Sequence, residues 1–580
     1  MSTKTACPLD CFDACSVVVD EGKLKGDVHH PYTNGYLCPH LNHFWKQDRI
    51  TQPRLHGKPV SMGEALEHLE KLIRDGLDGN GVLHYRGSGN FGLMQAVTDH
   101  FFASVGATLT NGSLCDGAGE AGVLEGRGVN HVLPPEQIAR SEVVVVWGRN
   151  IHTTNSHLLP FLKGKEIIVI DPVRTQMAEQ ADLFVQIKPA GDLFFAMLLA
   201  RFIVIEGMQD EEYLEKYGEE YEDFYELTQT VRIKAVLDMI GLGLGDIGRV
   251  LEKIRGKKTV ILTGVGVQKY RHGAEVIRAI DAVGVLLGLF GREGCGVSFL
   301  GSSGAGIDSP FAKAKRFEPK ARADFSDYDT VFVQGANPAA QMPDSARTRD
   351  LLAKAGHLVY FGLYENETSQ AAELVIPAKT FLEKRDIRTS YGHNAMLRMP
   401  QCENSGVGIG EYELAAKLCA AFGVPLESEE AYLEHFAAFA ETDEEDVQRV
   451  KGREALPYAD GFETDDGQFL FPEEYDFDFD MTEDYFLITP KSPHSLNSQF
   501  DREAHVYMHP GCGYAEGTVV RLSSVSGSVE LPLKHDDRLR EDCVLVYSGT
   551  PGVNFLTPSQ MSFEGKNAAY QANKIKVEAC

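Results

Sequence analysis

The 580-residue sequence predicts a multidomain α/β fold with mainly parallel sheets. Its length suits roughly three or four domains of about 150 residues each. Short apolar runs recur along the chain and end in small or polar residues, at 143–150, 166–175, 259–268, 330–338 and 358–368. Such runs, without alternation of polar and apolar residues, are typical of strands buried on both faces, as in parallel sheets flanked by helices.

The segments between these runs supply the helices, since residues 192–206 and 273–289 have helical periodicity. Ligands of such sheets bind beyond the carboxyl ends of the strands. Glycine there lets a backbone amide approach a phosphate, and Asp171 can accept hydrogen bonds from a ribose or from guanine. One Gly-rich turn is more often an ordinary turn than a nucleotide site. Five of them, in two sheet regions, predict a large or paired dinucleotide.

Four cysteines near the start of the chain have the spacing of metal ligands. Cys7, Cys11, Cys15 and Cys38 form the pattern Cys-x3-Cys-x3-Cys-x22-Cys. Thiolates at such spacing bind either zinc or an iron–sulfur cluster. Zinc sites more often show two Cys-x2-Cys pairs, so the pattern favours a four-iron cluster. Buried cysteines of an apolar core are the third interpretation.

The composition limits compartment and partners. Eleven cysteines are too few for a disulfide scaffold and no export signal precedes Cys7, so we expect reduced thiols and a cytoplasmic location. No stretch approaches the roughly 18 to 20 apolar residues of a membrane span, so no direct membrane insertion is expected. The net charge of 56 − 84 = −28 argues against nucleic acid as a partner.

In order along the chain, the motifs resemble those of the molybdopterin oxidoreductases of the dimethyl-sulfoxide reductase family. CPLDCFDAC and HPYTNGYLCP resemble the family's N-terminal cluster segment. VVVVWGRN, IVIDPVRTQMAEQADLFVQIKPAGD, GVGVQKYRHGAE, VQGANPAAQMPDS and ENETSQAAELVIPAKTFLEKRD follow in the order expected of its central domains. YFLITPKSPHSLNSQF and GTPGVNFLTPSQMSFEGKNAAYQANKIKV resemble its C-terminal barrel, so the resemblance runs from Cys7 to about Lys576.

The resemblance implies a molybdenum or tungsten ion held by two molybdopterin guanine dinucleotides, beside a 4Fe-4S cluster bound by the four N-terminal cysteines. The strand-end residues would bind the two dinucleotide arms, which explains why such motifs come twice. The candidate cofactor-binding residues are Trp147, Gly148, Asn150, Asp171, Arg174, Thr175, Gly191, Asp192, Gly264, Gly266, Gly335, Asn337, Glu367, Thr368, His393, Thr489, Ser495, Asn554 and Lys574.

In this family a Cys, selenocysteine or Ser of the protein normally binds the metal. TNGSLCDGAGEAG (110–122) stands at the matching place, so we expect Cys115 to be the ligand. A thiolate suits a soft metal; Ser113 as ligand and a structural role for Cys115 are the alternatives. The family's formate dehydrogenases usually carry His directly after this ligand, and Asp116 stands there in this chain, which argues against formate as substrate.

The resemblance also directs attention to the residue that follows the fourth cluster cysteine. Many relatives carry Lys or Arg shortly after it, between cluster and pterin, whereas this chain has Pro39 and His40. His40 is therefore a catalytic candidate that would couple the two centres, and a surface histidine is the alternative. His152 and His157 are expected to be cofactor contacts or polar loop residues, with a place in the substrate funnel as the alternative.

Strand pattern and resemblance together predict the domain order. Residues 1–52 form an iron–sulfur domain, and 53–125 with 305–425 form a discontinuous α/β domain around a second one at 126–304. Residues 426–475 are predicted to be an acidic linker. The segment 476–580 is predicted to be a molybdopterin dinucleotide-binding β-barrel, in which VVRLSSVSGSVELPL alternates as a half-buried strand pair should.

The predicted function is a cytoplasmic Mo- or W-dependent oxidoreductase that carries out oxygen-atom, sulfur or hydride transfer on a small-molecule substrate. Electrons would leave through the cluster to an electron-transfer subunit or a ferredoxin, since the sequence has one cluster motif and no separate flavin or nicotinamide motif. Three alternatives stay open: a formate dehydrogenase-like enzyme, a non-redox hydratase of the same family, and a subunit without the metal cofactor. Cys115 and the full set of motifs argue against the last.

Overall fold

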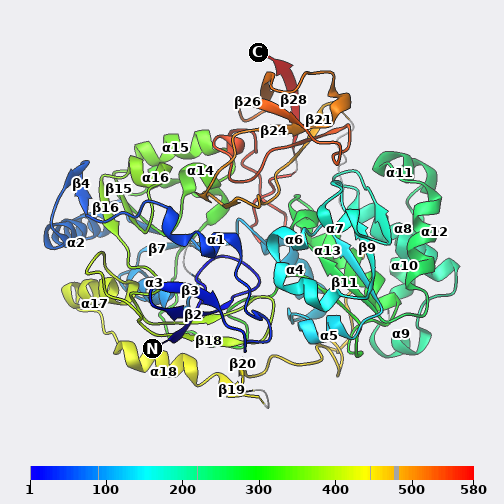
Figure 1. Ribbon diagram of the computed structural model, residues 1–580, viewed down its shortest axis with the longest axis horizontal. Coiled ribbons are helices and arrows are strands. Elements are labelled where there is room, and N and C mark those ends of the chain that lie inside the picture. Colours follow the sequence, from blue (N-terminus) through cyan, green and yellow to red (C-terminus); the bar gives the residue numbers. More distant parts are fainter. Residues whose placement is uncertain (1, 89–90, 219, 444–445, 476–481, 572) are drawn as a thin grey trace.

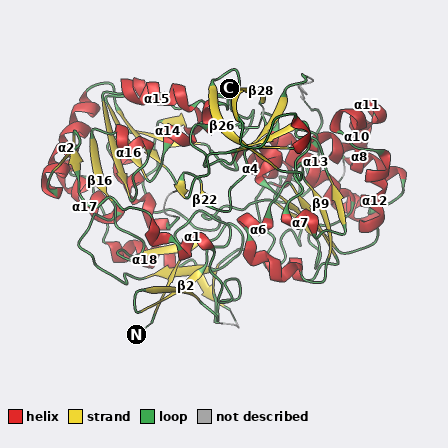
Figure 2. Ribbon diagram, turned by 45° about the horizontal axis from the view of Figure 1, so that its top comes forward, coloured by secondary structure: helices red, strands yellow, loops and turns green. Residues whose placement is uncertain are grey.

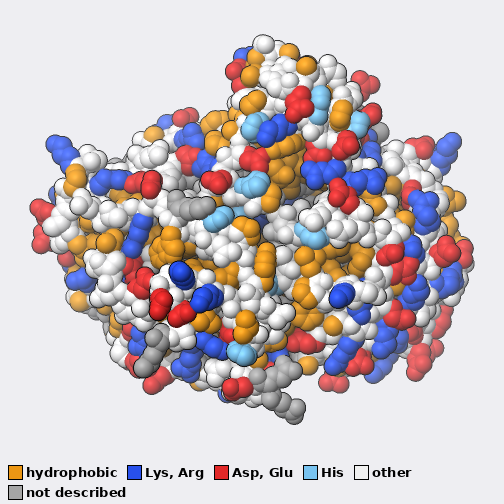
Figure 3. Space-filling model, viewed as in Figure 1, with side chains coloured by type: hydrophobic (Ala, Val, Ile, Leu, Met, Phe, Trp, Pro, Cys, Tyr) orange, Lys and Arg blue, Asp and Glu red, His pale blue; other side chains and the backbone are white. Residues whose placement is uncertain are grey.

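The computed structural model describes residues 2–580 except 89–90, 219, 444–445, 476–481 and 572. Two α/β lobes lie side by side, with a small N-terminal sheet in front of the gap between them and a barrel above it (Figure 1). The predicted multidomain α/β class, with mainly parallel sheets and a C-terminal barrel, is confirmed. In Figure 3 charged side chains crowd the lobe that carries α8–α12, whereas the middle of this face is mainly uncharged.

The lobe on the right of Figure 1 contains a five-stranded parallel sheet in the order β10-β9-β8-β11-β12. Every residue of β8 and of β11 is buried, as their apolar sequences predict. The two predicted helices are α8 (Asp192–Ile205) and α13 (Gly273–Leu286), which pack on each other. The strands are β8 Val143–Trp147, β9 Glu166–Ile170, β10 Leu183–Val185, β11 Thr259–Thr263 and β12 Gly296–Ser298.

The other lobe contains an eight-stranded, mainly parallel sheet in the order β13-β7-β6-β14-β15-β16-β4-β5. The chain leaves this sheet after β7 and returns at β13, which pairs with β7 in parallel, so the lobe is discontinuous in sequence. The exact domain boundaries stay predictions. The strands are β4 Arg54–Leu55, β5 Lys58–Pro59, β6 Val82–Arg86, β7 Thr108–Asn111, β13 Phe317–Pro319, β14 Thr330–Gln334, β15 His357–Gly362 and β16 Leu374–Pro377.

Helices cover both faces of this sheet. On one face α2 (Met62–Asp78), α3 (Val97–Ser104) and α17 (Glu411–Phe422) share a core with Phe332, and on the other α15 (Ser345–Lys354) packs near Val333. Further helices of the two lobes are α4 Gly117–Arg127, α5 Pro135–Ala139, α6 Ile151–Thr154, α7 Gln176–Glu179, α9 Glu211–Tyr217, α10 Tyr221–Gln229, α11 Ile233–Ile240, α12 Leu244–Ile254, α14 Pro338–Gln341 and α16 Glu367–Ala371.

The small N-terminal sheet lies at the bottom of Figure 2, and its cysteine-rich loop lines the cavity described below. Its antiparallel strands are β1 (Thr3–Ala6), β2 (Ser16–Asp20) and β3 (Lys23–Gly26), and the loop of residues 7–15 joins the first two. Cys38 directly precedes the short helix α1 (Pro39–Asn42). Cys38 packs against the same hydrophobic cluster that contains Cys7 and Cys15, so the fold brings the fourth cysteine towards the others.

The predicted acidic linker is folded onto the lobes. It forms α18 (Glu429–Ala437) and a hairpin of β19 (Ala440–Thr442) and β20 (Gln448–Val450). Further on, Phe469 and Phe471 are buried in the core of the five-stranded lobe. Residues 476–481, where the linker meets the predicted barrel, lie outside the described residues.

The C-terminal segment forms a closed barrel in the order β21-β27-β24-β26-β25-β28. The predicted half-buried strand pair is β25 with β26, antiparallel, with Val520 opposite Leu531. The short hairpin β22–β23 (Ser495–Leu496 and Gln499–Phe500) lies outside the barrel. The barrel strands are β21 Tyr485–Ile488, β24 Val506–Met508, β25 Val519–Ser523, β26 Ser528–His535, β27 Cys543–Leu545 and β28 Lys574–Ala579. Among the described residues, no helix has the length and apolar character needed to cross a membrane.

Candidate functional site

A single cavity of about 1140 Å³ lies where the two lobes, the cysteine loop and the barrel meet. The carboxyl ends of β8, β9 and β11 open into it from one lobe, and those of β6, β14 and β15 from the other. Ligands of parallel sheets bind at these ends. The five cysteines singled out from the sequence all line this cavity: Cys7, Cys11, Cys15, Cys38 and Cys115.

The cysteine loop is held in shape by a buried arginine of the discontinuous lobe. Arg388, on β17 (Asp386–Thr389, paired with β18 at Met396–Met399), donates hydrogen bonds to the backbone oxygens of Cys7 at 3.3 Å and Cys11 at 3.4 Å. Burial and the neighbouring Cys11 and Cys38 raise the pKa of Cys7 well above its usual value. Thiols in such a site become thiolates only when a metal group binds them.

Cys115 lies in the turn between β7 and α4, and hydrogen bonds fix that turn. The hydroxyl of Ser113 accepts from the backbone N–H of Cys115 at 2.8 Å and donates to the carboxylate of Asp116 at 2.9 Å. The side-chain amide of Gln268 donates to the carbonyl of Cys115 at 2.8 Å. Burial raises the pKa of Cys115 to about 12. The Ser113 hydroxyl is thus engaged in the turn, whereas the Cys115 sulfur is free to face the cavity.

Two glycines allow the ends of β8 and β11 to approach each other closely. Gly148 has a φ of +62°, and a Cβ atom added to Gly264 would lie 1.9 Å from the Gly148 carbonyl oxygen. A side chain at either position would therefore disrupt the strand ends. The same lobe places two carboxylates, Asp171 and Asp192, in the cavity lining, and burial raises their pKa to about 7 and about 6.

Arg149 is a buried cation that sequence reasoning passed over, although it stands inside the WGRN motif. Its Nε donates to the side-chain oxygen of Asn155 at 2.9 Å, and its guanidinium lies 4.7 Å from the centre of the Phe12 ring. Its Nη1 and Nη2 atoms and the neighbouring Asn150 Oδ1 are buried without a hydrogen-bond partner among the described residues. Burial lowers the pKa of Arg149 to about 10. Unpaired buried donors of this kind indicate a missing ligand.

Most of the predicted site residues lie around the cavity, and some do not. Besides the cysteines, the cavity is lined by His40, Gly148, Asn150, Asp171, Thr175, Asp192, Gly264, Gly266, Gly335, Asn337, Thr489, Ser495 and Asn554. Seven predicted residues are absent from its lining: Trp147, Arg174, Gly191, Glu367, Thr368, His393 and Lys574. The role of both groups as cofactor ligands stays a prediction.

Several of the residues outside the lining support those inside it. Trp147 donates its indole N–H to Asp192 at 2.7 Å, and Asn337 donates to Glu367 at 2.7 Å. His393 is buried behind the cysteine loop, where its ring stacks on Tyr32 at 4.2 Å. These residues hold the rim in place without facing the cavity.

Five lysines that were not predicted as site residues also line the cavity: Lys269, Lys320, Lys379, Lys384 and Lys491. Lys269 donates to the carbonyl of Leu114 at 2.5 Å, and burial lowers its pKa to about 8. Burial likewise lowers the pKa of Lys320 to about 8. Each is a single Lys among unrelated neighbours, so no periodicity or spacing marks it in the sequence.

Comparisons with known proteins agree with this geometry. The family model described as molybdopterin oxidoreductase matches residues 82–419. The probable oxidoreductases YyaE and YoaE of Bacillus subtilis (strain 168) are 28% and 25% identical to the chain. The YyaE match covers 83% of this chain and 78% of the relative, and the YoaE match covers 99% and 98%. The solved structure of acetylene hydratase from Pelobacter acetylenicus has a TM-score of 0.78, covers 100% of both chains and is 16% identical, which shows a shared fold.

Proposed function

The chain belongs to the molybdopterin oxidoreductase family, and on this premise we propose an enzyme with two molybdopterin guanine dinucleotides, a Mo or W ion and a 4Fe-4S cluster. One observation carries the proposal: the N-terminal cysteines, Cys115 and the strand ends of both lobes line the same cavity. When bound, these groups supply two-electron chemistry at the metal and one-electron transfer through the cluster.

Cys7, Cys11, Cys15 and Cys38 are the proposed cluster ligands. Among the described residues, no three His, Cys, Asp or Glu side chains lie close enough together to hold one metal ion. A single zinc would require sulfurs about 2.3 Å from one centre, whereas in a four-iron cluster each thiolate binds its own iron. The sequence pattern, with three cysteines on one loop, a distant fourth and no Cys-x2-Cys pair among them, supports a cluster over zinc.

Cys115 is the proposed ligand of Mo or W. Its sulfur is a soft donor, and the turn that carries it is fixed by Ser113 and Gln268. The engagement of the Ser113 hydroxyl with Asp116 supports Cys115 over Ser113.

The two dinucleotide arms would occupy the strand ends of the two lobes. On the first lobe the unpaired donors of Arg149 offer hydrogen bonds to an anionic group. The glycines 148 and 264 allow the close strand ends beside which that group would lie. Buried Asp171 and Asp192 offer acceptors, as recognition of a ribose or guanine requires. On the second lobe Asn337 and Gly335 take the corresponding positions.

The substrate would be a small molecule that reaches the metal through the cavity. We further propose an electron-transfer subunit or a ferredoxin as partner and a reducing, cytoplasmic location. All eleven cysteines are free in the structure, which suits such a compartment.

Elemental analysis for Mo, W, Fe and Zn tests the proposal, on protein purified without oxygen from cells supplied with both molybdate and tungstate. We expect Mo or W together with about four irons per chain. Stoichiometric zinc without iron, or iron without Mo and W, would contradict it. A substrate converted at the same rate with and without an electron acceptor would identify a hydratase instead.

A further inference from the structure

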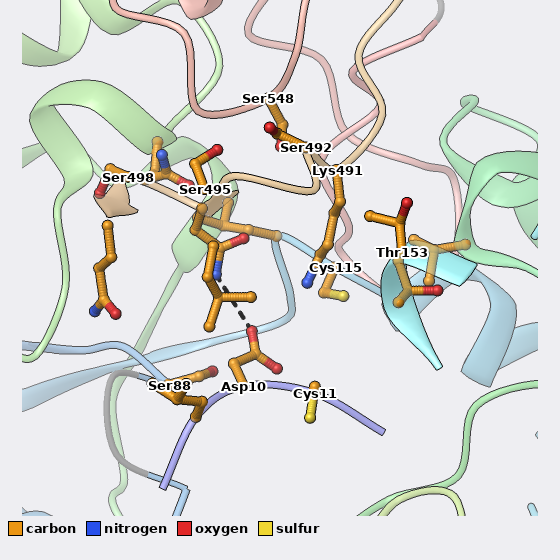
Figure 4. Close-up of a pocket in the computed structure, with 18 of the residues that line it drawn as sticks. Asp10, Cys11, Ser88, Cys115, Thr153, Lys491, Ser492, Ser495, Ser498 and Ser548 are labelled. Carbon is orange, nitrogen blue, oxygen red and sulfur yellow. Dashed lines mark hydrogen bonds between the residues drawn. The ribbon is translucent and has the colours of Figure 1, made fainter. Parts of the chain in front are cut away.

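One segment crosses the cavity from the barrel to the cysteine loop, and we name residues 489–498 the strap. It begins after β21, and near its start the backbone N–H of Ser548 donates to the carbonyl of Pro490 at 3.0 Å. At its far end Asn497 donates from its side chain to the carboxylate of Asp10 at 3.4 Å, drawn as the dashed line in Figure 4. The strap is therefore anchored at both ends, and it lines the cavity that contains both sulfur sites.

Lys491 projects from the strap into this space. In Figure 4 its side chain extends down beside Cys115, with Asp10 and Cys11 below it. Lys491 is half-buried and lines the cavity. No hydrogen bond or ion pair joins its ammonium to any of the described residues. Burial acts to lower the pKa of Lys491, but Asp10, Cys115 and Cys11 outweigh it and raise the pKa. The ammonium is thus charged at neutral pH and is not used by the protein's own contacts.

The other cationic candidates at the cavity are placed differently. Lys269 is occupied by the carbonyl of Leu114 and lies 5.0 Å from the centre of the Tyr570 ring. The ring of His40 stacks on the ring of Phe500, with the two ring centres 5.3 Å apart. Burial and the charge of Lys491 lower the pKa of His40. Of these three residues, Lys491 is the one whose cationic group is engaged by no hydrogen bond, ion pair or ring among the described residues.

We propose that Lys491 is a positioning residue whose fixed positive charge acts on both the four-cysteine site and the metal held by Cys115. The inference rests on the proposed function. A cation in a low-dielectric site favours the more negative, reduced state of a neighbouring centre, so it raises that centre's reduction potential. The barrel segment would in this way supply a positive charge to the cluster from about 450 residues farther along the chain than Cys38.

The test is an anaerobic redox titration of the cluster's paramagnetic signal in wild type, K491Q, K491R and H40Q. Lys313→Gln removes the same charge from an exposed position away from the cavity and is the matched control. We expect a lower midpoint potential in K491Q, and a potential close to wild type in K491R, H40Q and K313Q. Iron and Mo or W content, measured on the same samples, shows that each variant is loaded.

An unchanged potential in iron-loaded K491Q, or an equal shift in H40Q, would overturn the role of Lys491. Lys491→Met, which keeps most of the side-chain stem, is the second neutral variant. Loss of iron from both neutral variants would also overturn it, because Lys491 would then be needed for assembly. Wild-type protein without an iron signal would instead contradict the proposed function, so the two failures are distinguishable.

Discussion

The carboxylate of Asp13 accepts a 2.8 Å hydrogen bond from Nδ1 of His157. The other ring nitrogen of His157 lies 3.1 Å from the carbonyl oxygen of Tyr36, so both nitrogens face acceptors. Burial acts to lower the pKa of His157, but the hydrogen bond to Asp13 outweighs it and raises the pKa. Nε2 of His157, the nitrogen that faces Tyr36, also lies 3.7 Å from the sulfur of Cys15. His157 is therefore a hydrogen-bonding residue beside a proposed cluster ligand.

Replacing His157 should make the cluster harder to reduce. His157→Gln removes the ring nitrogen that lies 3.7 Å from the Cys15 sulfur, and hydrogen bonds to such sulfurs raise cluster potentials. A redox titration followed by electron paramagnetic resonance should give a lower midpoint for H157Q. His29→Gln, at an exposed position of the same domain, should match wild type. An unshifted H157Q midpoint would show that the histidine only supports the loop.

Cluster iron should depend on the distant fourth cysteine. Cys38→Ala removes a thiolate that the other three cannot replace, so we expect iron to fall to a small fraction of the wild-type content. Cys295→Ala is the matched control, because Cys295 is buried but does not line the cavity. Colorimetric iron analysis of both variants decides the matter, and full iron in C38A would exclude Cys38 as a ligand.

Arg149→Met should weaken retention of the dinucleotide cofactor. The variant loses two buried donors that have no partner in the described residues, and a hydrogen bond to a charged group is worth about 1.5–3 kcal/mol. We expect at least roughly tenfold less guanine nucleotide to copurify with the protein. Arg140, which is exposed and paired with Glu293, provides the control R140M. Equal nucleotide content in the two variants would show that Arg149 does not bind the cofactor.

The ion pair between Glu367 and Arg502 predicts a pH-dependent link between the barrel segment and the discontinuous lobe. Two hydrogen bonds join the side chains, at 3.1 and 2.6 Å. Burial acts to raise the pKa of Glu367, but the hydrogen bonds from Arg502 and Asn337 outweigh it and lower the pKa to about 2. A lowered pKa contributes stability that is complete above the unfolded value of 4.5 and is lost as the pH falls towards 2.

Glu367→Gln should therefore destabilise the protein by about 2 kcal/mol at pH 7, with a smaller difference from wild type near pH 3.5. Thermal unfolding at both pH values measures this. Arg521→Gln, which breaks an exposed pair with Glu530, should change the unfolding temperature little. A difference that grows on acidification would contradict the assignment of the charge to Glu367.

The strands and their ends could be predicted from the sequence because each is a local pattern. The run VVVVW is uniformly apolar and became the fully buried β8, and the alternating segment 519–535 became the pair β25–β26. The cysteine spacing was equally local. Cys115 was selected by resemblance, and the structure places it in the same cavity as the other four.

What the sequence could not show is which distant segments meet. Asn497 and Asp10, which anchor the strap, are 487 residues apart, and Arg388 reaches the cysteine loop from β17. Phe469 and Phe471 are a second example. Because many acidic residues surround them in the sequence, the segment was predicted to be a solvated linker, whereas both rings are buried in the core of the five-stranded lobe. Contacts of this kind follow from the packing of whole lobes, and a single sequence carries no local signal for them.

X-ray absorption at the Mo or W edge, comparing wild type with Cys115→Ala, tests the central claim most directly. If Cys115 binds the metal, the alanine variant should retain most of its pterin, because residues of both lobes hold it, and should show one metal–sulfur bond fewer. Cys402→Ala, which changes a cysteine outside the cavity lining, should give the wild-type spectrum. The same number of metal–sulfur bonds in C115A and wild type, or a protein without Mo and W, would contradict the account.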